Sequence, residues 1–266
     1  MIIIGELLNS TRKRVRKAIK EQDAEFVKDL ARKQETAGAD YLDVNAGAFA
    51  TEEEPYLEWL IKTVREVSSL PLCIDSPKPE VLETGCELAG DAPLINSISA
   101  EEERFRKTLP LVKKYNASVI ALVMDDEGLT DDEDRMFFFF FCLIDNLTAE
   151  DISPGRIFVD CLVRPVSTNS SYGSIFLNLI SRIREKYPEV HFTCGLSNVS
   201  FGLPKRKILN RAFVLLSMSR GLDAAILDPL DAALMSQIKA AEALLGRDEF
   251  CMDYIAAARS GMFDDV

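Results

Sequence analysis

The stretch Leu72-Cys73-Ile74-Asp75-Ser76 joins a short apolar run to two polar residues. Three successive apolar residues fit a strand that is buried on both faces, and the polar pair marks the end of that strand. Similar short apolar runs occur along the whole sequence. The strand candidates are Met1–Ile4, Tyr41–Val44, Leu72–Ile74, Leu94–Ile95, Val119–Val123, Ile157–Val159, Phe192–Gly195 and Ala224–Leu227.

The segments between these strand candidates have the pattern of amphipathic helices. Leu57, Leu60 and Val64 recur at helical spacing. In the segment after the first strand, Asp23 is a suitable N-cap and Gly38 a suitable helix stop. Strands and helices therefore alternate, which predicts the α/β class with a parallel sheet.

Eight strand–helix units in 266 residues predict a single (β/α)8 TIM barrel that occupies residues 1–266 as one domain. The alternative is a doubly wound open sheet. Such a sheet usually carries a glycine-rich phosphate loop after its first strand. Here that place has the sequence Gly5-Glu6-Leu7-Leu8-Asn9, so the closed barrel is favoured.

The charge balance limits the partners and the location. The formal net charge is −12, which disfavours nucleic acids and anionic membrane surfaces as partners. No apolar run reaches the roughly 20 residues that a membrane helix needs. No basic segment precedes the apolar run at Met1–Ile4, so we expect no secretory signal and a cytoplasmic protein.

Cysteine and histidine usage narrows the chemistry further. The six cysteines include no C-x-x-C pair, and their scatter favours reduced thiols over a disulfide framework. His191 is the single histidine of the chain, which excludes a histidine-rich zinc site and a Ser/His triad elsewhere. It precedes a strand candidate, and we expect its role to be structural.

A carboxylate or amide follows nearly every strand candidate. In chain order these residues are Glu6, Asn9, Asp43, Asn45, Asp75, Asn96, Asp125, Asp126, Asp160, Asn198 and Asp228. Barrel enzymes carry their chemistry at the C-terminal ends of the strands. Such a rim offers many acceptors, some amide donors and almost no fixed positive charge. It suits a neutral heterocycle rich in N–H groups, whereas Asp228 and Asp231 disfavour the usual barrel phosphate site.

Two other interpretations of this rim remain open. Aspartate and asparagine also favour turns, so individual members could serve only to end their strands. Converging carboxylates could instead hold Mg²⁺, although amides alternate with the acids. We predict that no metal is bound.

Several strand-end segments also carry a known family pattern. The segments are Ile4-Gly5-Glu6, Leu42-Asp43-Val44-Asn45, Leu72-Cys73-Ile74-Asp75-Ser76, Ile95-Asn96-Ser97, Val159-Asp160, Gly221-Leu222-Asp223-Ala224-Ala225 and, most specific, Gly195-Leu196-Ser197-Asn198-Val199-Ser200 with Arg206 and Asn210-Arg211. Over nearly its whole length the chain resembles the pterin-binding barrel family. Within that family it is similar to the methyltetrahydrofolate:corrinoid methyltransferases.

The resemblance implies a folate site of known layout. Residues matching Asp75, Asn96 and Asp160 hydrogen-bond the pterin ring, and the residue matching Asn198 lies beside N5, where the methyl group is attached. Further residues expected at the site are Gly195, Ser197 and Arg206, with Glu6, Asn9, Asp43 and Asn45 on its rim. Tetrahydrofolate or 5-methyltetrahydrofolate is the implied substrate. The corrinoid (cobalamin) belongs to a separate partner protein, and the barrels are commonly homodimers.

The expected chemistry is methyl transfer assisted by an amide. N5 is a poor leaving group unless a donor follows it through the transition state. Asn198 can donate an amide N–H and, after a flip, accept from a protonated N5. No histidine or lysine is near it in sequence, so solvent is expected to deliver the proton. Asp75 and Asp160 would fix the orientation of the ring.

Two alternatives to this function stay open. A catalytically idle pterin-binding module would keep Asp75, Asn96 and Asp160 but would not need Asn198. A dihydropteroate-synthase-like enzyme would expel pyrophosphate and would need basic groups at the last two strands. Arg206 is available for that role.

Two features fall outside the family pattern. Phe137–Phe141 is a run of five phenylalanines in a helix-like segment, and five successive helical positions cannot all face one side. We expect a helix buried by two neighbours, one of them from a second subunit. The basic cluster is Arg12, Lys13, Arg14, Arg16, Lys17 and Lys20. It is either a solvated helix face or, through Arg12 and Lys13, an attractor for the folate glutamate tail or an acidic corrinoid protein.

Overall fold

Eight parallel strands form one sheet in the computed structural model, which describes residues 1–124, 128 and 130–264. The strands are β1 (Ile2–Asn9), β2 (Tyr41–Asn45), β3 (Leu72–Asp75), β4 (Leu94–Ser99), β5 (Ser118–Leu122), β6 (Ile157–Asp160), β7 (His191–Thr193) and β8 (Ala224–Leu227). They pair in the order β7-β6-β5-β4-β3-β2-β1-β8. A parallel bridge between Gly195 and Ile226 joins the two ends, so the sheet closes into a barrel. The predicted fold is confirmed.

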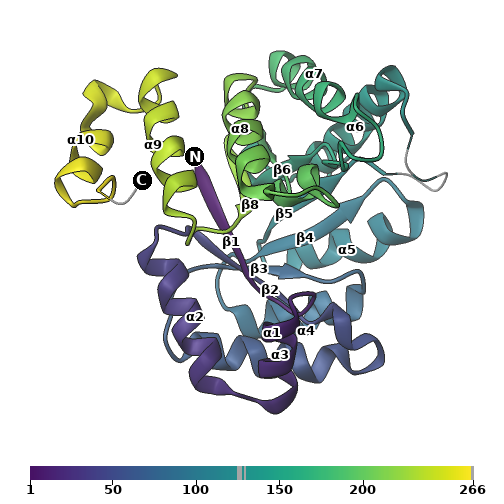
Figure 1. The fold of residues 1–266 in the computed structure, drawn as a ribbon. Coiled ribbons are helices and arrows are strands. Elements are labelled where there is room, and N and C mark those ends of the chain that lie inside the picture. Colours follow the sequence, from purple (N-terminus) through teal and green to yellow (C-terminus); the bar gives the residue numbers. More distant parts are fainter. Residues whose placement is uncertain (125–127, 129, 265–266) are drawn as a thin grey trace.

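Helices connect the strands and cover the outside of the barrel (Figure 1). They are α1 (Lys13–Glu21), α2 (Ala24–Thr36), α3 (Glu53–Arg65), α4 (Pro79–Ala89), α5 (Glu102–Lys114), α6 (Glu133–Ala149), α7 (Tyr172–Lys186), α8 (Arg206–Ser219), α9 (Ala232–Leu244) and α10 (Met252–Arg259). Four short 3-10 segments are η1 (Gly47–Glu52), η2 (Pro154–Arg156), η3 (Leu196–Ser200) and η4 (Glu249–Cys251). None of the helices that the structure describes is long and apolar enough to cross a membrane.

Apolar side chains of the strands point both ways, which explains why the strand sequences are almost continuously hydrophobic. The larger core lies between the sheet and the helices, where Leu42, Ile74 and Val119 are fully buried. A smaller cluster of strand residues fills the inside of the barrel. It contains Ile4, Cys73, Leu94, Ile120, Phe158 and Ala224.

Local signals place several helix ends where the sequence predicts them. The Asp23 carboxylate caps α2 by accepting from the backbone N–H of Phe26 at 3.2 Å. Gly38 follows the end of that helix with a φ of 93°, a conformation that favours glycine. In α3, Leu57, Leu60 and Val64 form part of the buried face, as expected from their spacing.

Most strand bounds differ by one or two residues from the predicted ones, and β1 and β4 extend well beyond their predicted ends. β1 continues through Glu6 to Asn9, so Glu6 lies within the strand and not after it. β4 likewise continues past Asn96 to Ser99. The cause is a local register shift in each strand, between Gly5 and Leu8 and between Asn96 and Ile98. Such shifts let a strand continue through polar residues that resemble a strand end. Asp125 and Asp126 lie outside the described residues.

The phenylalanine run lies in α6, as predicted, but only part of it is buried. Phe140 is enclosed, whereas the Phe138 side chain is 60% exposed. Basic side chains cover other members, with Arg182 over the Phe137 ring at 4.6 Å and Lys186 over the Phe141 ring at 3.4 Å. Cation–π contacts therefore replace part of the expected second apolar neighbour.

Candidate functional site

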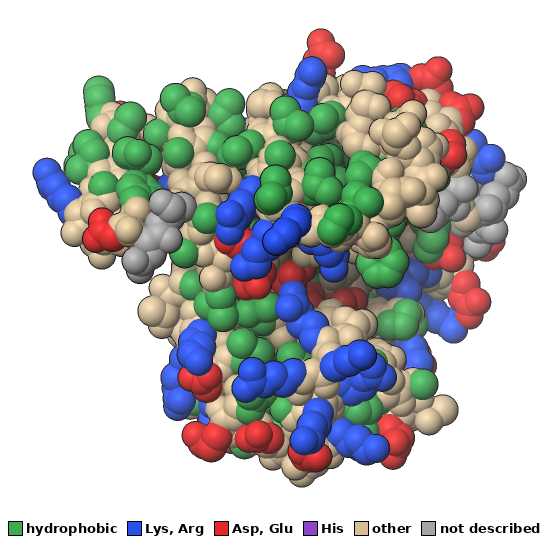
Figure 2. Space-filling model, viewed as in Figure 1, with side chains coloured by type: hydrophobic (Ala, Val, Ile, Leu, Met, Phe, Trp, Pro, Cys, Tyr) green, Lys and Arg blue, Asp and Glu red, His purple; other side chains and the backbone are tan. Residues whose placement is uncertain are grey.

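The C-terminal ends of the strands meet at one end of the barrel, its mouth. Register places three polar residues in one row there, because Asn45 pairs with Asp75 and Asp75 pairs with Asn96. Asp160 ends β6, and β7 is followed by the 3-10 segment that carries Asn198. In the face shown in Figure 2, acidic side chains lie in a hollow and basic side chains stand beside it.

Asp75 is held in place by its neighbour on β2. The Asn45 side-chain amide donates to Asp75 Oδ2 at 2.9 Å, and the same nitrogen also donates to the Asp75 backbone oxygen at 3.3 Å. Burial raises the pKa of Asp75 to about 6, although the bond from Asn45 acts in the opposite direction. The carboxylate is thus a fixed acceptor near the mouth.

Asn45 itself is fully used by the protein. Its Oδ1 accepts from Ser10 Oγ at 3.0 Å and from the backbone N–H of Gly47 at 3.1 Å. With its amide directed at Asp75, Asn45 acts as a support for that carboxylate. The structure therefore gives it a positioning role within the predicted rim.

Asp43 lies deeper than the other acids. Its side chain is 1% exposed, and among the described residues no partner hydrogen-bonds its Oδ1. Burial and the nearby Asp75 carboxylate raise its pKa well above the usual range, while contacts from Cys73 and Asn96 act to lower it. A carboxyl group in this position favours the neutral, protonated form.

Asp160 is the second carboxylate acceptor at the mouth and is buried, with 8% of its surface exposed. Burial raises its pKa to about 7, against the opposing effect of backbone N–H donors from Leu162 and Gly195. The Leu162 N–H lies 2.7 Å from Oδ1. These donors fix the carboxylate and link it to the start of the loop that carries Asn198.

The seventh-strand loop brings an amide next to a glycine. A Cβ at Gly195 would lie 3.0 Å from the Asn198 side-chain nitrogen, so the glycine leaves room for that amide. Asn198 is exposed in η3, and among the described residues none hydrogen-bonds its side chain. The amide is available to a ligand at the mouth.

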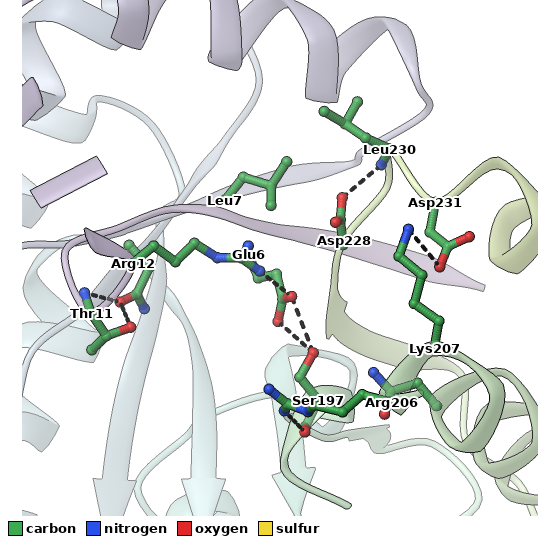
Figure 3. A network of polar contacts seen from close by, with 12 residues as sticks. Glu6, Leu7, Thr11, Arg12, Ser197, Arg206, Lys207, Asp228, Leu230 and Asp231 are labelled. Carbon is green, nitrogen blue, oxygen red and sulfur yellow. Dashed lines mark hydrogen bonds and ion pairs between the residues drawn. The ribbon is translucent and has the colours of Figure 1, made fainter. Parts of the chain in front are cut away.

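A polar network joins this loop to β1 (Figure 3). Ser197 Oγ donates to Glu6 at 3.1 Å, and Glu6 also pairs with Arg12. Arg206 donates to the Ser197 backbone oxygen and, through Nε at 3.0 Å, to Ser200 Oγ. Burial raises the pKa of Glu6, with Arg12 the main opposing influence. Glu6, Ser197 and Arg206 thus hold the backbone on which Asn198 stands.

Other predicted rim residues act as turn-formers. Asn9 Oδ1 accepts from the backbone N–H of Thr11 at 3.0 Å and from its hydroxyl at 2.7 Å. Asp228 Oδ1 accepts from the backbone N–H of Leu230 at 2.9 Å. For these two residues the turn interpretation explains the contacts that the structure shows.

The expectation of almost no positive charge at the mouth is wrong. A cavity of about 170 Å³ beside the seventh-strand loop is lined by Arg12, Arg206 and Lys207 as well as by Glu6, Asp228 and Asp231. The basic side chains come from α8 and from the residue before α1, not from strand ends. The Asp231 carboxylate, which the sequence suggested would repel phosphate, pairs with Arg211.

Two supporting residues were missed in the sequence. Arg104 on α5 donates to backbone oxygens of Ser76, Pro77 and Ser97, and so ties the exits of β3 and β4 together. Glu53 is 1% exposed and accepts from Ser76 Oγ at 2.6 Å. Both lie in ordinary helical segments, where only their partners distinguish them from solvated charges.

The single histidine lies at the N-terminal end of its strand, whereas the mouth is formed by the C-terminal ends of the strands. His191 begins β7, where it was expected to precede the strand, and its Nδ1 is 3.1 Å from Asp223 Oδ2. Its ring packs on Phe158 with centroids 4.6 Å apart. These contacts support a structural role. Across the described part of the chain, no three His, Cys, Asp or Glu side chains are grouped to hold a metal ion.

Comparison with known proteins identifies the family. The family model described as "Pterin binding enzyme" matches residues 5–228. Methylcorrinoid:tetrahydrofolate methyltransferase of Eubacterium limosum is 39% identical over 100% of this chain and 99% of its own length. Methionine synthase of Mycobacterium leprae is 31% identical over 85% of this chain, which corresponds to 20% of that protein.

Solved structures show the same fold at lower identity. Dihydropteroate synthase from Xanthomonas albilineans has a TM-score of 0.69 and 19% identity, over 93% of this chain and 94% of that one. This likeness concerns the fold alone. Because the family model covers most of the barrel and a relative matches from end to end, the chain belongs to the pterin-binding enzyme family.

Proposed function

We propose that this protein is a methyltransferase that moves a methyl group between N5 of tetrahydrofolate and the cobalt of a corrinoid carried by a separate protein. The observation that carries the proposal is that a half-buried and a buried carboxylate occur together with an exposed amide. Asp75 and Asp160 are fixed carboxylates at the mouth, and Asn198 is exposed in the loop after β7, in a chain matched end to end by a methyltransferase. The name of that relative favours the methylcorrinoid as donor.

The carboxylates are suited to a pterin ring. When ionised, Asp75 and Asp160 can only accept hydrogen bonds, and the ring of a folate presents several N–H groups that donate them. Asn96, in register with Asp75, adds both a donor and an acceptor. Such a set orients the ring so that one edge faces the seventh-strand loop.

Asn198 is proposed to act on N5. The corrinoid supplies the cobalt that gives up or receives the methyl group. When tetrahydrofolate is methylated, N5 forms the new bond to carbon and loses its proton to solvent. In the reverse direction the bonding electrons return to N5, which then takes a proton. The Asn198 amide hydrogen-bonds N5 as this charge changes, so its effect is largest in the transition state.

A dihydropteroate-synthase-like activity is less well supported. The basic groups near β7 and β8 would suit an anion, which removes one objection to it. However, the solved synthases share only the fold with this chain, whereas the methyltransferase shares 39% of the sequence. A catalytically idle module is disfavoured by the exposed Asn198 beside the accommodating Gly195.

The direct test mixes the protein with methylcobalamin and tetrahydrofolate and follows the cobalamin spectrum. Demethylation of the cobalamin with matching formation of 5-methyltetrahydrofolate is the expected result. The Asn198→Ala variant is the matched control, since it should bind folate and turn over far more slowly. Tight folate binding without methyl transfer in either direction would overturn the proposal.

We also propose that the protein is a cytoplasmic homodimer that receives a corrinoid protein at its mouth. The support is an apolar face on α8, η4, α9 and α10, called here the outer apolar face (Figure 2). Its exposed members are Ile208, Leu209, Leu216, Leu244, Leu245, Phe250, Met252, Tyr254 and Ile255. An exposed face of this size usually marks a protein contact. A second copy of the chain would cover it and leave the mouth open.

A further inference from the structure

The cavity beside the seventh-strand loop is lined by three basic side chains, Arg12, Arg206 and Lys207. It is also lined by the carboxylates of Glu6, Asp228 and Asp231. Arg206 donates to neutral oxygens of Ser197 and Ser200, and no carboxylate of the described residues lies within ion-pair distance of it. In Figure 3 its side chain extends toward Ser197 along one wall of the cavity. Within the described part of the chain, this guanidinium is therefore not paired with a carboxylate.

The other basic side chains share their carboxylates. Lys207 Nζ lies 3.5 Å from Asp231 Oδ2, but the same carboxylate also pairs with Arg211. Arg12 pairs with Glu6, which in addition accepts from Ser197. Arg12 and Lys207 keep 40% and 66% of their side-chain surface exposed, so both can reach a further anion.

This charge contrasts with the rest of the molecule. The chain carries a net charge of −12, yet this network places four cations (Arg12, Arg206, Lys207 and Arg211) against three carboxylates (Glu6, Asp228 and Asp231). The N-terminus of α8, a helix of 14 residues, begins at Arg206 and adds a partial positive charge. An anion that enters the cavity is attracted by the basic side chains and by the N-terminus of α8.

The position of the cavity relative to Asn198 suggests which anion binds there. Arg206 holds the backbone oxygen of Ser197, the residue before Asn198. In a folate, the tail leaves the ring at the carbon bonded to N5. With N5 beside Asn198, the p-aminobenzoyl group and its glutamate therefore pass toward Arg206 and the cavity.

We propose that this cavity binds the carboxylates of the folate glutamate tail through Arg206, Lys207 and Arg12, and that the protein prefers polyglutamylated folate. The inference rests on the proposed function, because it places N5 beside Asn198. Of the six residues in the basic cluster found in the sequence, only some therefore take part in this site. Arg12 lines the cavity, whereas Lys13 is exposed at the start of α1 and is not among its lining residues.

The test compares tetrahydrofolate monoglutamate with the triglutamate. The dissociation constant of each is measured by calorimetry without corrinoid, and the KM of each with methylcobalamin as donor. The wild-type protein should bind the triglutamate more tightly. Lys207→Gln should weaken triglutamate binding about threefold to fivefold, or about 0.7–1 kcal/mol, as for an exposed charge pair. Arg12→Gln should act in the same way.

Two controls separate tail binding from a structural role. Lys13→Gln removes a neighbouring charge outside the cavity and should leave the ratio of triglutamate to monoglutamate affinity as in the wild type. The effect of Lys207→Gln should also shrink as salt rises, because screening weakens contacts between exposed charges. Loss of a merely structural contact would weaken both folates equally and would depend little on salt.

The outcomes distinguish the two proposals. Methyl transfer with equal affinity for the two folates overturns the tail site and leaves the proposed function standing. The proposed tail site is also overturned if Lys207→Gln and Arg12→Gln keep the wild-type preference for the triglutamate over the monoglutamate. Absence of both folate binding and methyl transfer overturns the proposed function together with this inference.

Discussion

At the scale of single residues, replacing Asn198 should slow methyl transfer much more than it weakens folate binding. Its amide is exposed and is expected to contact N5 most strongly in the transition state. Asn198→Ala should therefore lower kcat on the order of 10- to 100-fold while changing the dissociation constant of tetrahydrofolate by about threefold or less. Stopped-flow methyl transfer and equilibrium titration measure the two quantities. Normal kcat with weak binding would show that Asn198 contacts only the ground state.

Replacing Asp160 should stabilise the empty protein but weaken folate binding. Burial raises its folded-state pKa to about 7, so the folded state keeps a proton that the unfolded state releases near pH 4. Stability therefore falls as pH rises from about 4 to about 7. Asp160→Asn should remove this fall and raise the free energy of unfolding at pH 8 by about 2–4 kcal/mol.

The same substitution should weaken folate binding at pH 8, because the ionised carboxylate accepts from ring N–H groups and the amide is only partly suited to do so. Denaturant unfolding and folate titrations between pH 5 and pH 8 test both signs. The idea fails if the variant follows the same pH dependence of unfolding as the wild type. Asp43→Asn serves as the comparison, since Asp43 is buried deeper and favours the neutral form.

At the scale of elements, Arg104 links α5 to the exits of β3 and β4. Its guanidinium donates to backbone oxygens at distances of 2.7 to 3.2 Å, and burial lowers its pKa. Arg104→Met should lower the free energy of unfolding by about 1–3 kcal/mol, since buried carbonyls lose their donors. Folate affinity should fall as well, because Asp75 ends β3 and Asn96 lies in β4.

Lys107→Met is the matched control for Arg104. It lies one turn further along α5 and, among the described residues, its ion pair is with Glu103 on the surface. Its removal should change the free energy of unfolding by no more than about 0.5 kcal/mol. Equal losses in the two variants, measured by urea unfolding, would show that α5 simply tolerates methionine poorly.

The secondary-structure elements were the part of the molecule that could be predicted best from the sequence. All eight strands were found, because each is a short buried run with polar residues at its end. The bounds of β1 and β4 were missed, since a register shift in each strand depends on its neighbours and leaves no local mark. Arg104, Glu53 and the basic wall of the cavity were missed for the same reason. Their contacts depend on how the chain folds, as with Glu53 and Ser76, which are 23 residues apart in the chain.

The site itself could be predicted only as a set of strand-end residues. Register confirms that Asp75 and Asn96 are neighbours, and the structure adds that Asn45 supports Asp75. The binding and catalytic roles of Asp75, Asn96, Asp160 and Asn198 stay predictions. So does the single domain over residues 1–266, in which α9, η4 and α10 follow the last strand.

At the scale of the whole molecule, the outer apolar face should decide the oligomeric state. Along α8, Ile208, Ala212 and Leu216 are spaced by four residues and exposed, and Leu244 at the end of α9 is 87% exposed. A helical stripe of this kind is stable in water only when another apolar surface covers it. The wild-type protein should therefore have twice the chain mass in solution, with an interface of at least about 800 Å² per partner.

Leu216→Glu should shift this equilibrium to the monomer, because a dimer would bury a carboxylate without a partner. Phe138→Glu is the control, since Phe138 is also 60% exposed but lies on α6, away from the outer apolar face. Light scattering after size exclusion over a range of concentrations measures the mass of both variants.

Methyl transfer from free methylcobalamin should continue in a folded Leu216→Glu monomer, because every proposed folate contact comes from one chain. A wild-type monomer at all concentrations would leave the outer apolar face to another partner and would remove the homodimer from the proposal.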